Sequence, residues 1–248
     1  MYLKTVRYLR ENIQDYSKYP FNIECLANFS ELELPTNVTF FIGENGSGKS
    51  TLLEAIADIS DFNTAGGGRN HLYEVDKAEA ALGDYIRLSW SRKVTKGFFL
   101  RAETFYQFAT HIDNLEENPA IKYAAYGGKS LHHQSHGESF LSLFKHSFGD
   151  KAIYLLDEPE AALSPTRQLS LLKIMKDLED EAQFIIATHS PILLGYPNAT
   201  IYSFDDGGIE PIRYEETIHY ILTKRFLNAP EQIFREFLML QNAIILHH

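Results

Sequence analysis

The feature that most constrains this chain is a glycine-rich run at residues 43–51, GENGSGKST, which directly follows the apolar segment at residues 38–42. Glycines let the backbone curl tightly enough for consecutive N–H groups to point at phosphate oxygens. Leu52, Leu53 and Ile56 then form one apolar face of a helix whose positive N-terminal end faces the same place. This order of strand, loop and helix predicts a phosphate-binding loop for a nucleoside triphosphate.

Two residues of the run have specific expected roles. Lys49 is expected to reach the β and γ phosphates, and Ser50 to ligate Mg²⁺. The other residues of the run are expected to line the phosphates: Gly43, Glu44, Asn45, Gly46, Ser47, Gly48 and Thr51.

Length and composition limit the class of protein. The chain has 248 residues, 44% of them hydrophobic, which fits one α/β domain with lobes. Its one cysteine, Cys25, excludes disulfides within the chain and agrees with a reducing compartment. No apolar run approaches the ~18 residues that would cross a bilayer. We therefore expect a cytoplasmic protein without membrane insertion.

The formal net charge of −10 argues against a broad electropositive surface. Sequence-independent binding to nucleic acid depends mainly on Lys and Arg that neutralise phosphates. A local basic strip at Arg87, Arg92, Lys93 and Lys96 is more typical of a solvated strand edge or loop. A nucleic-acid partner stays open, but the charge does not indicate one.

The hydrophobic pattern predicts a parallel core sheet. Continuous apolar runs at residues 152–156 and 184–187 are typical of strands buried on both faces. Between them, Ser164 and Pro165 are expected to begin an amphipathic helix, which makes a strand–helix–strand crossover. Residues 1–42, including an alternating strand at residues 21–25, predict a small antiparallel sheet. Two further strands, at residues 85–90 and 97–100, are expected to be joined by a basic turn.

Polar residues follow both core strands. Asp157 and Glu158 end the first run, at the edge where ligands bind in open α/β sheets, and fit a Mg²⁺ ligand and the base that polarises an attacking water. His189 follows the second run and fits a hydrogen-bond donor to the γ-phosphate.

A second anion site is predicted at Ser135 and Gly137, which precede an amphipathic helix. One nucleotide does not need two such sites in one chain. We therefore expect this one to serve the nucleotide of a second copy. Near the C-terminus, Pro230 begins another helix, whose apolar residues are expected to be core: Ile233, Phe234, Phe237 and Leu238.

Taken together, these motifs resemble the ATP-binding-cassette ATPases, in the branch of the structural-maintenance-of-chromosomes proteins, the recombination mediator ATPases and the overcoming-lysogenization-defect nucleases. The segments that carry the resemblance are GENGSGKST (43–51), QSHGES (134–139), YLLDEPE (154–160) and ATHSP (187–191). Across residues 1 to about 215 the chain is similar to a bacterial family of short, stand-alone "predicted ATPases".

The resemblance implies a P-loop NTPase fold of the ABC ATPase type, in which a mostly parallel sheet flanked by helices carries an antiparallel β subdomain and a small helical lobe. A single domain would span residues 1–248. The nucleotide core with its β subdomain would cover 1–60 and 150–215, the helical lobe 103–148, and C-terminal helices 216–248. ATP and Mg²⁺ would be sandwiched in a head-to-tail homodimer, with Ser135 and Gly137 supplied by the partner copy.

The chain departs from the commonest pattern of these ATPases. Arg101, with Glu103 nearby, stands where a glutamine usually links Mg²⁺ to the helical lobe, and His136 replaces a glycine of the signature loop. The leading hypothesis is a Mg²⁺-dependent ATPase that drives or regulates an unidentified protein partner, in DNA maintenance or in defence against mobile DNA. A transporter's nucleotide-binding subunit is the main alternative, and a nucleotide-gated module that hardly hydrolyses is another.

Overall fold

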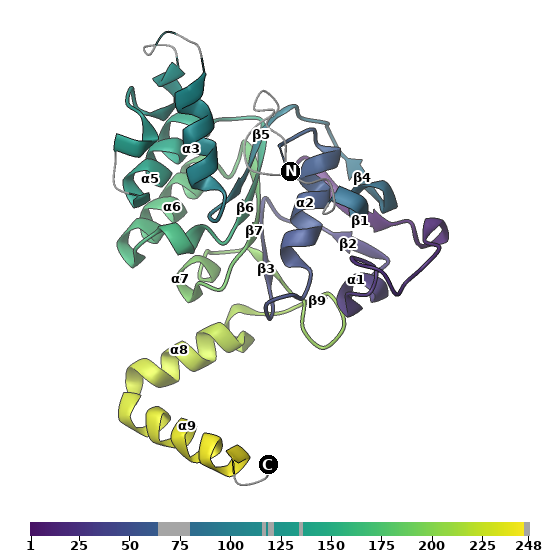
Figure 1. Cartoon of the computed structure of the whole chain (residues 1–248), viewed down its shortest axis with the longest axis vertical. Helices are drawn as coiled ribbons and strands as arrows, with labels where there is room; N and C mark the ends of the chain where they lie inside the picture. Colours follow the sequence, from purple (N-terminus) through teal and green to yellow (C-terminus); the bar gives the residue numbers. More distant parts are fainter. Residues whose placement is uncertain (64–79, 116–117, 119–121, 134–135, 246–248) are drawn as a thin grey trace. The chain divides into compact units, whose positions relative to one another are not determined.

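The computed structural model describes residues 1–63, 80–115, 118, 122–133 and 136–245. The chain divides into two compact units, Met1–Pro211 and Ile212–His248. In its described part, the first unit contains two β-sheets with helices around them (Figure 1). The second unit contains two consecutive helices.

A large, mostly parallel sheet forms the centre of the first unit. Its strand order is β5-β6-β7-β3-β8-β9, in which β9 runs antiparallel to β8 and the other neighbours are parallel. Every residue of β3, β6 and β7 is buried, which explains their continuous apolar sequences. The strands are β3 (Val38–Ile42), β5 (Lys96–Arg101), β6 (Ala152–Asp157), β7 (Ala182–Ala187), β8 (Thr200–Ser203) and β9 (Glu210–Pro211).

A smaller antiparallel sheet lies beside it, with the order β2-β1-β4. Its strands are β1 (Leu3–Tyr8), β2 (Glu31–Glu33) and β4 (Ile86–Trp90). Helix α2 (Lys49–Ile59) lies between the two sheets (Figure 1). Leu52, Leu53 and Ile56 of this helix are completely buried in one core that includes residues of both sheets. Burial on several sides fixes the helix, and therefore the loop before it.

A buried glutamine also joins the two sheets. Gln183 in β7 accepts hydrogen bonds from the backbone N–H groups of Tyr2 and Leu3 at 3.0 and 2.8 Å. Its amide donates to the Leu3 carbonyl at 2.9 Å. Because a buried polar group without partners is costly, these bonds explain how a glutamine is accommodated in a fully buried strand.

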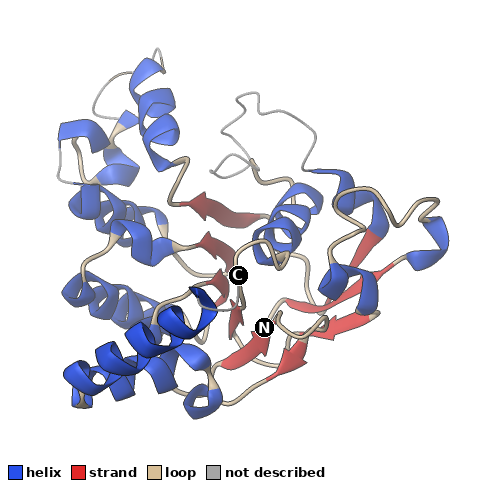
Figure 2. Ribbon diagram, turned by 60° about the horizontal axis from the view of Figure 1, so that its bottom comes forward, coloured by secondary structure: helices blue, strands red, loops and turns tan. Residues whose placement is uncertain are grey.

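The other face of the large sheet is covered by helices, as Figure 2 shows. Aromatic residues make this layer: Phe105 of α3 packs on Phe140 of α5, with ring centroids 4.6 Å apart, and Phe148 stacks on Tyr154 of β6 at 3.9 Å. In the described residues of this unit, the helices besides α2 are α1 (Glu24–Asn28), α3 (Phe105–Asn114), α5 (His136–Ser147), α6 (Pro165–Leu178) and α7 (Pro191–Leu194). Short 3₁₀ turns span Arg10–Asn12, Ala80–Tyr85, Ala124–Tyr126, Leu131–His133 and Pro159–Ala162.

These features confirm the predicted fold class. The crossover from β6 through α6 to the parallel neighbour β7 is the predicted strand–helix–strand unit. The antiparallel subdomain and the helical lobe are also present in the described residues. The division into one domain over residues 1–248 stays a prediction.

One local prediction was wrong. Residues 21–25 do not form a strand: Glu24–Asn28 is a short helix, because the buried Cys25, Leu26 and Phe29 repeat at helical spacing. The two strands predicted at residues 85–90 and 97–100 are present as β4 and β5, and the segment that joins them contains Arg92 and Lys93, but they belong to different sheets. β4, with alternating exposure, pairs with β1, whereas β5, with a buried centre, pairs with β6 in the large sheet.

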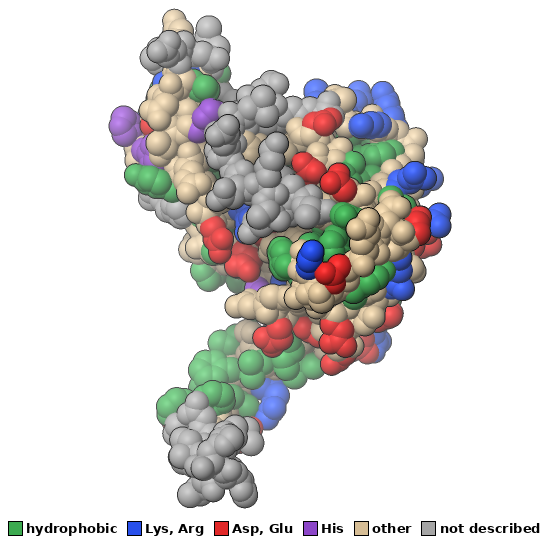
Figure 3. All heavy atoms as spheres, turned by 45° about the vertical axis from the view of Figure 1, so that its right-hand side comes forward, with side chains coloured by type: hydrophobic (Ala, Val, Ile, Leu, Met, Phe, Trp, Pro, Cys, Tyr) green, Lys and Arg blue, Asp and Glu red, His purple; other side chains and the backbone are tan. Residues whose placement is uncertain are grey.

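The second unit consists of α8 (Ile218–Asn228) and α9 (Pro230–Ile245), preceded by a 3₁₀ turn at Tyr214–Glu216. Pro230 begins α9 as predicted. The expectation of a core stripe was wrong for Phe234 and Phe237, which are 60% and 57% exposed. A unit of two helices has too little interior to bury both helix faces. Figure 3 shows hydrophobic side chains gathered over these helices. No helix in the described part of the chain is long and apolar enough to cross a membrane.

Candidate nucleotide-binding site

The predicted residues of the 43–51 loop, together with Asp157, Glu158 and His189, lie at one edge of the large sheet. In the register of the strands, Arg101 lies opposite Asp157, Asp157 opposite Ala187, and Ala187 opposite Phe41. The ends of β5, β6, β7 and β3 are therefore level. This edge is where open parallel sheets place ligands, because the loops that follow the strands open there.

The loop at residues 43–51 is wrapped around the side chain of Lys49. The Lys49 ammonium donates hydrogen bonds to the carbonyl oxygens of Gly43 and Glu44, at 2.6 and 2.9 Å. Gly48 precedes α2 in a left-handed conformation, with φ of 99°. A Cβ at Gly48 would also lie 2.9 Å from Leu26, so both its conformation and its contacts require glycine.

Burial affects the pKa of Lys49. Its side chain is buried, and the loss of hydration lowers the pKa of its ammonium, while the carboxylates of Glu158, Asp157 and Asp205 act in the opposite direction. Within the loop, Glu44, Asn45 and Gly46 are exposed, whereas Gly43, Gly48 and Thr51 are buried like Lys49. An ammonium among backbone carbonyls and N–H groups at a helix N-terminus is suited to bind an anion such as a phosphate.

Asp205, which follows β8, holds the start of the loop. One of its carboxylate oxygens accepts from the backbone N–H of Glu44 at 2.9 Å, and the other accepts from the Ser203 hydroxyl at 2.9 Å. Asp205 was not among the residues predicted from the sequence. The sequence does contain a signal for Asp205, because this acidic residue follows a segment rich in β-forming residues. Its proximity to the loop, however, depends on β8 lying next to β3.

Ser50 and Asp157 form a pair of oxygen donors. The Ser50 hydroxyl donates to Asp157 Oδ1 at 3.0 Å. Burial raises the pKa of Asp157 to about 6, against the opposing effects of Arg101 and of the Ser50 hydrogen bond. A hydroxyl and a carboxylate at this separation are the hard oxygen ligands that Mg²⁺ prefers. The side chains present therefore fit the metal predicted for them.

Glu158 and His189 lie next to this pair. Glu158 Oε1 is 3.8 Å from His189 Nε2. The backbone of Glu158 is left-handed, with φ of 48°, a conformation that costs a non-glycine residue free energy and is often found at functional sites. Its N–H donates to the Ala187 carbonyl at 3.0 Å, which fixes the residue to the end of β7.

Glu160 holds the backbone of His189 in place. Its carboxylate accepts from the backbone N–H of His189 at 2.6 Å, and burial raises the pKa of Glu160. Ser190 then caps α7 by accepting from Ile192 and Leu193. The sequence analysis did not identify Glu160, although it lies only two residues after Glu158.

The second predicted anion site is only partly described. Ser135 lies outside the described residues. Gly137 is the second residue of α5, and a Cβ there would lie 2.3 Å from Arg167 Nη1 and 3.0 Å from the Ala162 carbonyl. The nearest neighbours of Gly137 are therefore residues at the start of α6 and before it, and not residues of the 43–51 loop. Arg167 also lies 3.6 Å from Glu138.

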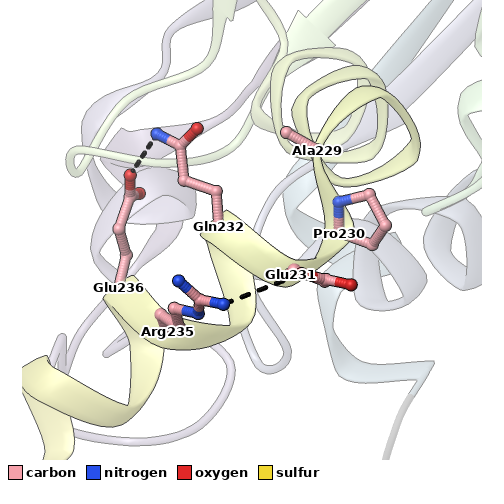
Figure 4. Close-up of a pocket in the computed structure, with 6 residues that line it drawn as sticks. All are labelled: Ala229, Pro230, Glu231, Gln232, Arg235 and Glu236. Carbon is pink, nitrogen blue, oxygen red and sulfur yellow. Dashed lines mark hydrogen bonds and ion pairs between the residues drawn. The ribbon is translucent and has the colours of Figure 1, made fainter.

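The second unit contains a hollow at the start of α9, shown in Figure 4. Its polar side chains interact with one another on the same helix. Gln232 donates a hydrogen bond to Glu236 at 2.9 Å, and Arg235 lies 3.7 Å from Glu231. Such exposed pairs are weak, and they do not converge on one point as a ligand site would. The residues that line the hollow are Ala229, Pro230, Glu231, Gln232, Arg235 and Glu236.

The fold and the arrangement of the motifs at the sheet edge define an ABC-type P-loop ATPase domain. Residues 38–118 and 135–195 match the model of a family described as "AAA domain, putative AbiEii toxin, Type IV TA system". The matched residues are more than half of the sequence, and the chain belongs to this family. No curated protein matches the chain.

Solved structures of ATP-binding cassettes are similar in fold. MJ1267, an ATP-binding cassette of an ABC transporter, is 17% identical with a TM-score of 0.53, over 91% of this chain and 96% of that chain. A nucleotide-free cassette from an ABC transporter is 18% identical with a TM-score of 0.51, over 90% and 96%. The SMC head domain from Thermotoga maritima is 15% identical with a TM-score of 0.47, over 86% and 100%. At these identities the two cassettes support the fold alone.

Proposed function

We propose that this chain binds Mg²⁺-ATP at the 43–51 loop and hydrolyses it to ADP and phosphate in the cytoplasm. The observation that carries the proposal is the convergence, at the ends of neighbouring strands, of five groups of complementary chemistry: the Lys49 ammonium, the Ser50 hydroxyl, the carboxylates of Asp157 and Glu158, and the His189 imidazole. Membership of an AAA domain family supports the choice of ATP.

Each group has a defined role in the proposed reaction. Lys49 neutralises β- and γ-phosphate oxygens, and Glu158 accepts a proton from a water molecule. The water oxygen forms a bond to the γ-phosphorus, while the bond from that phosphorus to the bridging oxygen breaks and its electron pair leaves with ADP. His189 donates a hydrogen bond to the γ-phosphate. Mg²⁺, held by Ser50 and Asp157, supplies further positive charge to the phosphates when bound.

The site is also proposed to work between two copies. In a head-to-tail dimer, Ser135 and Gly137 of one copy would contact the nucleotide that the other copy holds on its 43–51 loop. The support for this is the signature-like sequence at residues 134–139 and the position of Gly137 at the N-terminus of α5, a 12-residue helix. ATP would hold the copies together, and hydrolysis would release them.

The proposed biological role is to drive or regulate a protein partner. The description of the family as a putative AbiEii toxin of a Type IV TA system supports a role in defence over one in DNA maintenance. Acidic and basic side chains are interspersed on the face drawn in Figure 3, which does not favour nucleic acid as the first partner to test.

The alternative is the nucleotide-binding subunit of a transporter, and the similarity in fold to transporter cassettes is the observation that favours it. Fractionation separates the two proposals. Recovery of the chain with membranes, dependent on a membrane-embedded partner, would support the transporter subunit, whereas recovery in the soluble fraction would support the stand-alone ATPase.

The test of hydrolysis is the release of phosphate from ATP by the full chain and by Glu158→Gln. Loss of the base is expected to lower the rate by roughly 10²–10⁴-fold, while ATP binding measured by calorimetry is retained. Glu33→Gln, an exposed change on β2, serves as the control and should keep the wild-type rate. Equal rates for Glu158→Gln and the wild type would overturn the assigned base.

A further inference from the structure

A cluster of charged side chains lies directly beside the proposed Mg²⁺ ligands. Arg101, the last residue of β5, contacts three carboxylates. Its Nη1 donates to Glu54 Oε1, its Nε lies 3.5 Å from Asp157 Oδ2, and its Nη2 lies 3.7 Å from Glu103 Oε2. Glu54 comes from α2 and Asp157 from β6, so this arginine connects the helix after the phosphate-binding loop with two strands of the sheet.

The three carboxylates differ strongly in exposure. The side chains of Glu54 and Asp157 are 4% and 7% exposed, and that of Glu103 is 81% exposed. A buried carboxylate is unfavourable unless a cation compensates its lost hydration. Arg101 is the strongest of the groups that oppose the effect of burial on Asp157. The arginine is therefore positioned as the counter-charge of both buried acids.

This position conflicts with a bound metal ion. Asp157 is the carboxylate proposed for Mg²⁺, and a divalent cation and a guanidinium repel each other strongly at a separation of a few ångströms in a poorly hydrated site. The guanidinium can move away from Asp157 and still be next to carboxylates, because its other nitrogens already contact Glu54 and approach Glu103. A small rotation would keep its charge compensated and leave Asp157 to the metal.

We propose that Arg101 is a built-in counter-cation of the Mg²⁺ site: its guanidinium neutralises Asp157 until Mg²⁺ binds, and then turns toward Glu54 and Glu103. The inference rests on the proposed function, which assigns Asp157 to the metal. Arg101 acts here as a positioning residue. It sets the Mg²⁺ concentration at which the site fills, without touching the nucleotide.

The test is a Mg²⁺ titration of ADP binding by the full chain, followed by calorimetry, which requires no turnover. Removing the competing cation in Arg101→Gln is expected to lower the half-saturating Mg²⁺ concentration by roughly 3–10-fold. Arg101→Gln combined with Glu54→Gln also removes the buried acid that Arg101 contacts, and should show the same gain if the single variant folds poorly. Arg101→Lys, which keeps the charge, and Arg87→Gln, an exposed change on β4, should stay near the wild type.

Thermal unfolding distinguishes this role from a purely structural one. With EDTA present, Arg101→Gln should melt below the wild type, and Mg²⁺-ADP should reduce that difference, because Mg²⁺ replaces the missing cation at Asp157. An equal deficit in both conditions, or a half-saturating Mg²⁺ concentration that is unchanged or higher in the single and the double variant, would overturn the inference. If the wild type bound ADP with the same affinity in EDTA and in Mg²⁺, the inference would fail together with the assignment of Mg²⁺ to Ser50 and Asp157, while nucleotide binding at the 43–51 loop would stand. If it bound neither ADP nor ATP, the proposed function would fail and the inference with it.

Discussion

The Ser50 hydroxyl lies 3.0 Å from a carboxylate oxygen of Asp157, although the two residues are 107 positions apart in the chain. One is at the start of α2 and the other ends β6. The contact exists because β3 and β6 both pair with β7 in parallel, so that the loop after β3 and the end of β6 reach the same edge of the sheet.

This contact predicts how Mg²⁺ should affect nucleotide binding. In Ser50→Ala one of the two proposed oxygen ligands is lost. We expect the gain in ADP affinity that Mg²⁺ provides over EDTA to fall by about tenfold or more, as measured by calorimetry. Ser50→Thr keeps a hydroxyl and should retain the gain. A full gain in Ser50→Ala would show that the hydroxyl is not a metal ligand.

Asp205 should contribute to nucleotide affinity through the shape of the loop. In Asp205→Asn the side chain has a single acceptor oxygen for the two donors that the carboxylate serves, and the negative charge near Lys49 is removed. One lost hydrogen bond corresponds to an ADP affinity lower by roughly 3–10-fold.

Asp206→Asn is the matched control for that change, because Asp206 is the next residue and is exposed. Asparagine also tolerates its left-handed backbone, with φ of 56°. Equal affinities for the two variants would contradict a role for Asp205 in holding the loop.

The fold and much of the site could be predicted from sequence where the signal is local. The continuous apolar runs of β6 and β7 and the glycine pattern of the 43–51 loop each reveal their structure within a few residues. Asp157 and Glu158 then follow a recognisable strand. These elements place the loop and the carboxylates at one edge without any knowledge of long-range contacts.

The contributions of Asp205 and Arg101 could not be predicted in the same way, because they depend on strand order. Asp205 reaches the loop only because β8 lies next to β3, and Arg101 reaches Asp157 only because β5 lies next to β6. Glu54 does give a local signal, since it is a carboxylate between buried apolar residues of α2, but its partner comes from β5.

The packing of α6 against the sheet predicts a contrast between two leucines of the same helix. Leu171 is completely buried, whereas Leu169 is 58% exposed. Leu171→Ala should therefore lower the free energy of unfolding by about 2–5 kcal/mol, through lost burial and the cavity that remains. Leu169→Ala should change it by no more than about 0.5 kcal/mol. Denaturant unfolding followed by circular dichroism measures both, and equal losses would contradict the orientation of the helix.

In the proposed dimer, ATP joins two copies of this chain, with the 43–51 loop of one facing Ser135 and Gly137 of the other. The most direct measurement is the mass in solution of Glu158→Gln, by light scattering, with and without Mg²⁺-ATP, because loss of the base traps the nucleotide-bound state. We expect a monomer without nucleotide, a dimer with Mg²⁺-ATP, and no dimer when Ser135→Arg is added. A mass that stays that of a monomer at saturating Mg²⁺-ATP, or a dimer that Ser135→Arg leaves intact, would contradict it.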